Sequence, residues 1–206
     1  MSDEQHRRPH GHSSHDPNHV HNFDHMASSL LSEERRSWQD PERIFDSVGI
    51  PDSGVMVDIG CGPGFFTVPA AARCRGTVIG MDASPHLLSI CRSRLDVAGC
   101  SNAELVLMDA GNSIPLAGES AELVLIANVL HDMTSPPALL AEVARILKPG
   151  GRLVNIDWSR DDSEFGPPQE IRLSADESSS MMLSAGLRIE STLDAGPYHY
   201  CQVARK

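Results

Sequence analysis

The strongest constraint on the fold is a regular alternation of short apolar segments with segments of helical periodicity. Five apolar segments of strand length lie at residues 55–59, 77–81, 105–108, 123–127 and 153–156. Segments that are apolar at nearly every position are typical of strands buried on both faces of a parallel sheet. Helices must then cover both faces. The sequence therefore predicts a doubly wound, Rossmann-like α/β fold with three αβα layers.

Local signals place the remaining elements of this fold. Proline follows a capping residue at Asp40-Pro41, Ser84-Pro85 and Ser135-Pro136, which is typical of the first turn of a helix. A capping box at residues 174–177 predicts one more helix. Two β-like runs, 187–193 and 198–204, follow with a short turn between them. We expect a seven-stranded, mostly parallel sheet closed by an antiparallel C-terminal hairpin.

Composition separates the chain into two parts. Seven of the ten histidines lie in residues 1–25, where large apolar side chains are rare. Such a segment cannot bury enough apolar surface to offset its ordering entropy, so we predict a disordered His-rich tail over 1–25 and one domain over 26–206. The pairs His10/His12 and His19/His21 offer imidazole ligands to Ni²⁺, Zn²⁺ or Cu²⁺. Transition-metal binding or delivery by this tail is therefore an alternative function, whereas no metal site is expected in the domain.

Net charge and segment length exclude several classes of protein. A formal charge of −11 argues against binding of nucleic acids or anionic membranes. No segment has the length of a membrane span, and the N-terminal residues contain no signal-peptide core, so we expect a cytoplasmic protein. Five scattered cysteines predict reduced thiols and not a disulfide framework.

A glycine loop follows the first predicted strand, at the position where parallel sheets bind ligands. Gly60, Gly62 and Gly64 allow a tight turn and close approach of a ligand to bare main chain. The spacing departs from the dinucleotide fingerprint G-x-G-x-x-G, because Phe65 stands at the last position. Asp58 would repel a pyrophosphate but suits a ligand that carries an ammonium group.

Five segments of residues 50–157 resemble the class I S-adenosylmethionine-dependent methyltransferases, in particular the small-molecule branch of the ubiquinone and menaquinone C-methyltransferases. The matching segments are 57–64, 78–84, 107–110, 123–131 and 147–153. The resemblance implies S-adenosyl-L-methionine as cofactor and in-line transfer of its methyl group to a small-molecule acceptor. It also implies cofactor contacts: Asp58, Gly60, Cys61, Gly62 and Gly64 at the methionine part, Asp82 and Ala83 at the ribose, Asp109 and Ala110 at the adenine, and Asn128 beside the sulfonium.

The chemistry of these side chains agrees with the implied roles. One carboxylate can accept hydrogen bonds from two ribose hydroxyls, as expected for Asp82, and Asp109 can accept one from an adenine amino group. The alternative is that both aspartates only cap the turns that follow them.

His131 is the candidate catalytic residue, because it follows the fourth strand and an imidazole can remove a proton from an acceptor near neutral pH. The alternative is that it packs at a helix start and bonds to a backbone carbonyl. Trp158, Tyr198, His199 and Tyr200 could line an acceptor pocket, although packing is favoured for at least two of them. We expect the pocket to be open or covered only by residues 20–45.

Other functions remain as alternatives. One is a module that binds the cofactor without methylating anything. A protein or nucleic-acid methyltransferase is disfavoured by the acidity and, for nucleic acids, by Asn128-Val-Leu-His131 in place of an Asn/Asp-Pro-Pro-aromatic motif. A monomer and a homodimer are both compatible with the sequence.

Overall fold

The computed structural model describes residues 27–111, 113–161 and 163–206. The predicted His-rich tail and its metal-binding pairs lie outside the described residues. Within the described ranges, none of the helices has the length and apolar character needed to cross a membrane.

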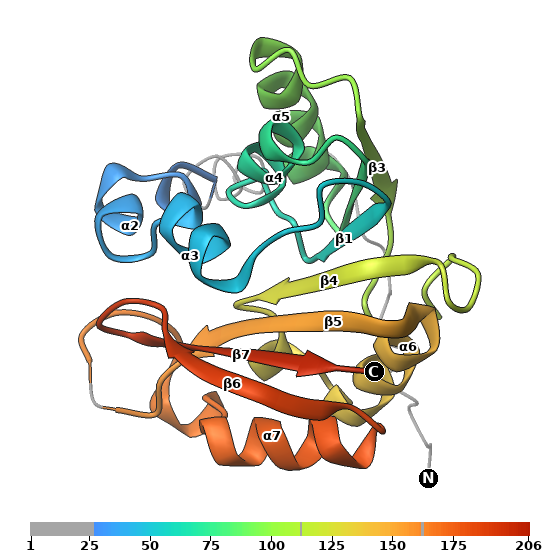
Figure 1. Cartoon of the computed structure of the whole chain (residues 1–206). Helices are drawn as coiled ribbons and strands as arrows, with labels where there is room; N and C mark the ends of the chain where they lie inside the picture. Colours follow the sequence, from blue (N-terminus) through green and yellow to red (C-terminus); the bar gives the residue numbers. More distant parts are fainter. Residues whose placement is uncertain (1–26, 112, 162) are drawn as a thin grey trace, which may run out of the picture.

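Seven strands form one sheet in the order β3-β2-β1-β4-β5-β7-β6 (Figure 1). Strands β1 to β5 run parallel to one another, and β7 runs antiparallel to both β5 and β6. This confirms the predicted fold class, including the closing hairpin. The strands are β1 Val55–Ile59, β2 Thr77–Asp82, β3 Ala103–Leu107, β4 Ala121–Ala127, β5 Leu147–Trp158, β6 Arg188–Asp194 and β7 His199–Arg205.

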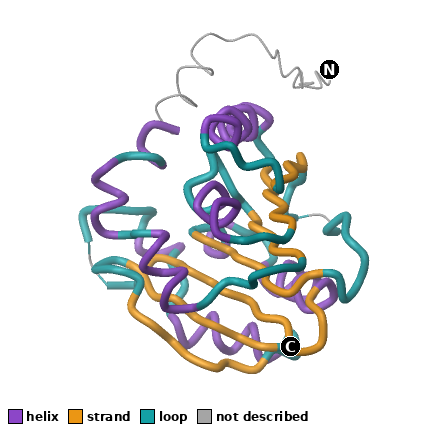
Figure 2. Tube along the Cα trace, turned by 45° about the horizontal axis from the view of Figure 1, so that its top comes forward, coloured by secondary structure: helices purple, strands orange, loops and turns teal. Residues whose placement is uncertain are grey.

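Helices lie on both sides of this sheet (Figures 1 and 2). They are α2 Glu33–Trp38, α3 Pro41–Val48, α4 Thr67–Arg73, α5 Pro85–Val97, α6 Pro136–Ile146 and α7 Ala175–Ser184, with short 3₁₀ helices η1 Leu130–Asp132 and η2 Gln169–Ile171. Side chains alternate across each strand, so Met56 packs into the core beneath α3, α4 and α5, whereas Val57 packs into the core beneath α6 and α7. This alternation produces the three layers.

The helix starts follow the sequence signals. Asp40, Ser84 and Ser174 each accept a backbone N–H at the start of α3, α5 and α7, whereas Ser135 makes no such bond although Pro136 begins α6. One expected boundary differs. Residues 148–151, expected only to end α6, belong to β5, because an irregularity in the β4–β5 register absorbs the Pro-Gly-Gly turn.

The strand order places the ligand-binding edge of the sheet. Strand β1 pairs with β2 on one side and with β4 on the other, so the loop after β1 lies where the chain changes direction across the sheet. Helices α2 and α3 lie on the side toward which the arrowheads of β4 and β5 point (Figure 1). The first two helices therefore stand next to the edge where a ligand is expected.

Candidate functional site

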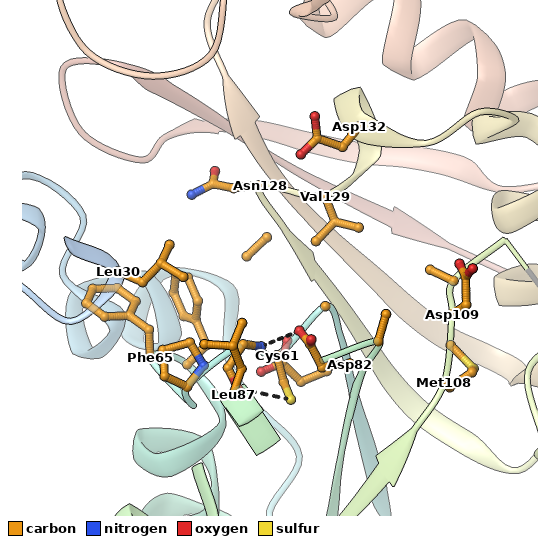
Figure 3. A pocket seen from close by; sticks show the side chains of 18 of the residues that line it. Leu30, Cys61, Phe65, Asp82, Leu87, Met108, Asp109, Asn128, Val129 and Asp132 are labelled. Carbon is orange, nitrogen blue, oxygen red and sulfur yellow. Dashed lines mark hydrogen bonds between the residues drawn. The ribbon is translucent and has the colours of Figure 1, made fainter. Parts of the chain in front are cut away.

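A cavity of about 340 Å³ opens at the carboxyl ends of β1, β2 and β4 (Figure 3). Its volume lies within the range of small-molecule sites. Figure 3 shows Leu30 and Phe65 at one end and Met108 and Asp109 at the other. Nine residues singled out from the sequence surround this cavity, namely Asp58, Gly60, Cys61, Gly62, Asp82, Ala83, Asp109, Ala110 and Asn128. Gly64 and His131 are not among the residues that line it.

The glycine loop is shaped by backbone contacts. The N–H groups of Gly60 and Cys61 both donate to Met81 O, at 2.8 and 2.9 Å. At Gly60 φ is +73°, and a Cβ there would lie 2.2 Å from a methyl of Val129. At Gly62 the nearest atom to a Cβ would be 3.9 Å away, on Leu30, so its main chain lies bare toward the cavity. The first glycine allows close packing and the second leaves space for a ligand.

Gly64 packs the glycine loop against a neighbouring helix. Its φ is +84°, and a Cβ would lie 2.6 Å from Cys91 Sγ on α5. Its N–H donates to Cys61 O at 3.0 Å. The structure therefore shows Gly64 packing the loop against α5, and its contact with a cofactor stays a prediction.

Asp82 ties the glycine loop to the end of β2. Its Oδ2 accepts from Gly62 N and its Oδ1 from Ser84 N, both at 2.8 Å. The turn-capping alternative therefore describes part of its role, but each oxygen keeps a further lone pair for a ligand. Asp109 is similar and exposed, with Oδ1 accepting from Gly111 N at 2.9 Å.

Asp58 is the buried carboxyl of the site. Thr67 Oγ1 donates to its Oδ2 at 2.6 Å. Burial raises the pKa of Asp58 to about 7, an effect opposed by the Thr67 hydrogen bond and by the positive charge of Arg35. The carboxyl is therefore close to half ionised near neutral pH, and a cation bound beside it would favour the ionised form.

Cys61 lines the same cavity as a protonated thiol. Its Sγ donates to Gly62 O at 3.7 Å. Hydrogen bonding with Cys91, together with burial, raises the pKa of the Cys61 thiol far above its ordinary value. A thiol in this state can contact a ligand but is a poor nucleophile.

Helix α2, which the sequence did not predict, covers one end of the cavity. Arg35 lines the cavity although it is only 7 % exposed. Its Nε and Nη2 donate to Gln39 Oε1 at 3.0 and 2.9 Å, and its guanidinium lies 4.0 Å above the ring of Phe65. Burial lowers the pKa of Arg35 to about 10, against the charge of Asp58. The cap at Ser32 could have indicated this helix, but nothing in its sequence indicates a buried arginine.

Asn128 directly follows β4 and links this wall of the cavity to the residue after α2, Gln39. Its backbone is in the left-handed region at φ +59°, an uncommon conformation that asparagine tolerates. Its Nδ2 donates to Gln39 Oε1 at 3.4 Å, whereas its buried Oδ1 has no partner. An unpartnered oxygen at the wall of the cavity fits a site that awaits a hydrogen-bond donor from a ligand.

His131 lies beside the cavity and is tied to Asp157. Its Nδ1 is 2.6 Å from Asp157 Oδ1, its N–H donates to Asp157 Oδ2 at 3.1 Å, and its ring is 4 % exposed. Burial acts to lower the pKa of His131, but the contact and charge of Asp157 outweigh it and raise the pKa above the ordinary value. A carboxylate on Nδ1 orients the ring and leaves Nε2 as the nitrogen for a base role. That role stays a prediction, and the partner of the ring is a carboxylate and not a backbone carbonyl.

A family model described as a methyltransferase domain matches residues 57–155, the part of the chain that builds β1 to β5 and the glycine loop. The chain carries a class I methyltransferase domain. The match spans the cavity residues that the resemblance pointed to, together with the strands that hold them.

Relatives of this methyltransferase agree with that family. The demethylmenaquinone methyltransferase of Bacillus velezensis is 28 % identical over 141 residues, or 68 % of this chain and 59 % of the relative. That of Symbiobacterium thermophilum is 32 % identical over 114 residues, or 53 % and 45 %. The chain thus matches less than two thirds of the length of these relatives. A solved S-adenosylmethionine-dependent methyltransferase of Aquifex aeolicus shares the fold, with a TM-score of 0.82 and 24 % identity over 88 % of this chain and 97 % of that one.

The cofactor of this family, S-adenosylmethionine, fits the residues present. The cavity combines the bare main chain of Gly62, the buried carboxyl of Asp58 and the carboxyl of Asp82. A cation with an ammonium group and several hydrogen-bonding groups suits this set of partners.

Proposed function

We propose that this methyltransferase transfers a methyl group from S-adenosylmethionine to a small-molecule acceptor. The observation that carries the proposal is one cavity in which a bare glycine loop meets three carboxyl groups, those of Asp58, Asp82 and Asp109. When bound, the cofactor supplies a methyl group already activated for in-line displacement. The chain then needs to hold both reactants in line and exclude water, and it needs no metal.

Each part of the cavity has a proposed role. The glycine loop and Asp58 hold the methionine part of the cofactor, Asp82 with Ala83 binds the ribose hydroxyls, and Asp109 with Ala110 contacts the adenine. Leu30 and Arg35 shield the site from water, because both line the cavity from the N-terminal segment that covers it.

The relatives support a small organic acceptor, since the two curated proteins described above are named demethylmenaquinone methyltransferases. The charge of −11 disfavours nucleic acids as acceptors. Metal binding by the histidine pairs of residues 1–25, a cytoplasmic location and the choice between monomer and homodimer stay predictions.

Calorimetry with S-adenosylmethionine tests the first half of the proposal. The second half is tested by incubating the protein and cofactor with quinols, catechols, amines, thiols and metalloids and searching for methylated product by mass spectrometry. Absence of binding at millimolar cofactor would refute the proposal. Binding without methylation of any acceptor would instead support a cofactor-binding module.

A further inference from the structure

Unpartnered polar atoms are concentrated in one region of the molecule. Among the described residues, eight buried side-chain nitrogen or oxygen atoms have no hydrogen-bond partner. Five of the eight belong to three neighbouring places on the fold: Trp38 Nε1 and Gln39 Nε2, Asn128 Oδ1, and both ring nitrogens of His199. An unsatisfied buried polar group destabilises the fold, so a cluster of such groups indicates a site where a ligand supplies the missing partners.

The hydrogen bonds of Gln39 and Asn128 determine which of their side-chain amide atoms lack a partner. A guanidinium only donates, so the Gln39 atom that faces Arg35 Nε and Nη2 must be the oxygen, and Nε2 is left without a partner. The same oxygen also accepts from Asn128 Nδ2, which leaves Asn128 Oδ1 free. The two bonded amides therefore carry one donor without a partner, Gln39 Nε2, and one acceptor without a partner, Asn128 Oδ1.

Four rings pack together next to these amides, and we call them the aromatic box: Trp38, Trp158, Tyr198 and His199. The rings of Trp38 and His199 are stacked, with centroids 5.2 Å apart and planes inclined by 11°. Trp158 lies 4.0 Å from His199, its partner in the β5–β7 register, and Tyr198 meets Trp38 edge-on at 5.6 Å. Three of the rings thus belong to β5, β7 and the turn before β7, and the fourth, that of Trp38, reaches them from α2.

The aromatic box adjoins the cofactor cavity. Asn128 and Arg35 both line that cavity, Gln39 bonds to each of them, and Trp38 precedes Gln39 in the chain. The box therefore lies at the end of the cavity nearest β5 and β7, whereas Asp109 lies toward β3. A molecule that takes the place of Trp38 would lie near Gln39, which bonds to Asn128, the residue that the resemblance places beside the sulfonium.

We propose that the aromatic box binds the methyl acceptor, a planar aromatic molecule with a hydroxyl group, and that the Trp38 indole fills this site until the acceptor displaces it. This inference rests on the proposed function. The indole is itself a planar group with an N–H, stacked on His199 and without a hydrogen-bond partner. A planar acceptor of one or two rings fits the same space, and Gln39 Nε2, Asn128 Oδ1 and the His199 nitrogens then serve its hydroxyl.

His199 orients the acceptor and does not remove its proton. Burial, reinforced by the positive charges of Arg35, Arg172 and His131, lowers the pKa of His199 to about 3. The ring is therefore neutral at physiological pH, with one nitrogen that donates and one that accepts. It differs in this from His131, whose pKa is raised by Asp157.

Calorimetry with catechol in chelator-containing buffer tests the proposal, using protein saturated with S-adenosylhomocysteine. The chain has two tryptophans, both in the box, so quenching of their fluorescence reports the site independently of turnover. We expect catechol to bind and cis-1,2-cyclohexanediol, its saturated counterpart, to bind at least tenfold more weakly.

Substitutions test the roles of Trp38 and His199 separately. Trp38→Ala should strengthen catechol binding at least threefold by emptying the site, and His199→Ala should weaken it at least tenfold. His199→Gln, which keeps a donor and an acceptor, should stay within threefold of the wild type. Val97→Ala, at a side chain that is 91 % exposed on α5, serves as the matched control. Binding of S-adenosylhomocysteine with unchanged affinity verifies that each variant is folded.

The inference is overturned if neither the wild type nor Trp38→Ala binds catechol while S-adenosylhomocysteine still binds. It is equally overturned if His199→Ala binds catechol as the wild type does. Both results leave the proposed function standing. Failure to bind S-adenosylmethionine and S-adenosylhomocysteine would refute the proposed function itself, and the inference with it.

Discussion

The two sides of the cavity differ in whether their polar groups already have hydrogen-bond partners. On the cofactor side, polar groups already have partners within the chain: Asp82 accepts two backbone N–H groups and Asp58 accepts the Thr67 hydroxyl. On the side that we propose for the acceptor, called the acceptor side below and formed by α2 and the ends of β4, β5 and β7, five buried polar atoms of the described residues have none. The first side is preorganised by backbone geometry, whereas the second is closed by side chains that a ligand could replace.

Gly60→Ala should have the largest destabilising effect, because the cofactor side depends on backbone conformation. The new Cβ would lie 2.2 Å from Val129 Cγ2 at a φ of +73°. We expect the free energy of unfolding in urea to fall by about 3 kcal/mol. Gly99→Ala is the matched control, since its φ is +69° and nothing lies within 4 Å of its Cβ. It should cost about 1 kcal/mol from backbone strain alone.

A second substitution sharpens this result. Val129→Ala in the Gly60→Ala background removes the methyl group that the new Cβ meets and should recover part of the lost stability. If Gly60→Ala costs no more than Gly99→Ala, close packing does not shape the loop, and the contrast between the two sides fails.

Asp82→Ala should come next, with an effect on cofactor affinity. It releases Gly62 N and Ser84 N from their acceptor and removes the proposed partner of the ribose. We expect the Kd for S-adenosylmethionine, measured by calorimetry, to rise about 30-fold, or ~2 kcal/mol. Asp132→Ala removes an exposed carboxyl that also lines the cavity, toward the acceptor side, and should change that Kd by less than about twofold. Equal effects of the two substitutions would contradict the assignment.

The sequence was most informative on the cofactor side. Gly60 and Gly62 adopt positive φ values, which glycine reaches without steric cost, so a ligand loop can be recognised from composition and spacing. Asp82 follows a predicted strand directly, and parallel strands bring such ends together. Nine of the eleven predicted site residues surround the cavity for this reason.

The acceptor side could not be predicted in the same way. The hydrogen bond between Gln39 and Asn128 joins residues 89 positions apart, and no local pattern encodes such pairing. His131 and His199 also look alike in sequence, yet Asp157 pairs with the first, whereas the second is buried among rings. Only the tertiary structure shows that their pKa values shift in opposite directions.

Asp58→Asn should change how stability depends on pH. The pKa of this carboxyl is about 7 in the folded protein, against an ordinary value of 3.8. Between these values the folded state keeps a proton that the unfolded state has released, so the free energy of unfolding falls as pH rises from 3.8 to about 7. His131, with a raised pKa, adds a fall in the same direction as pH rises through its folded value, which the variant retains.

The difference between wild type and Asp58→Asn isolates the carboxyl. Urea unfolding at several pH values should show a shallower fall in the variant, by up to about 4 kcal/mol between the ends of the range. An asparagine oxygen can still accept from Thr67, so packing is preserved. Asp52→Asn, at a side chain that is 89 % exposed, should leave the pH dependence as it is in the wild type. Parallel curves for wild type and Asp58→Asn would show that this carboxyl titrates normally.

Arg35→Met should give the smallest effect, confined to the acceptor side. Methionine keeps much of the apolar contact with Phe65 but loses the hydrogen bonds to Gln39 Oε1 and Leu30 O. We expect amide hydrogen exchange within α2 to accelerate about threefold, while exchange in β1 and β4 stays unchanged. Arg36→Met is the control, because Arg36 is exposed in the same helix and its guanidinium lies 5.9 Å from the Phe65 ring. Faster exchange in β1 as well would mean that α2 supports the cofactor side too, and the two sides would then form one cooperative unit.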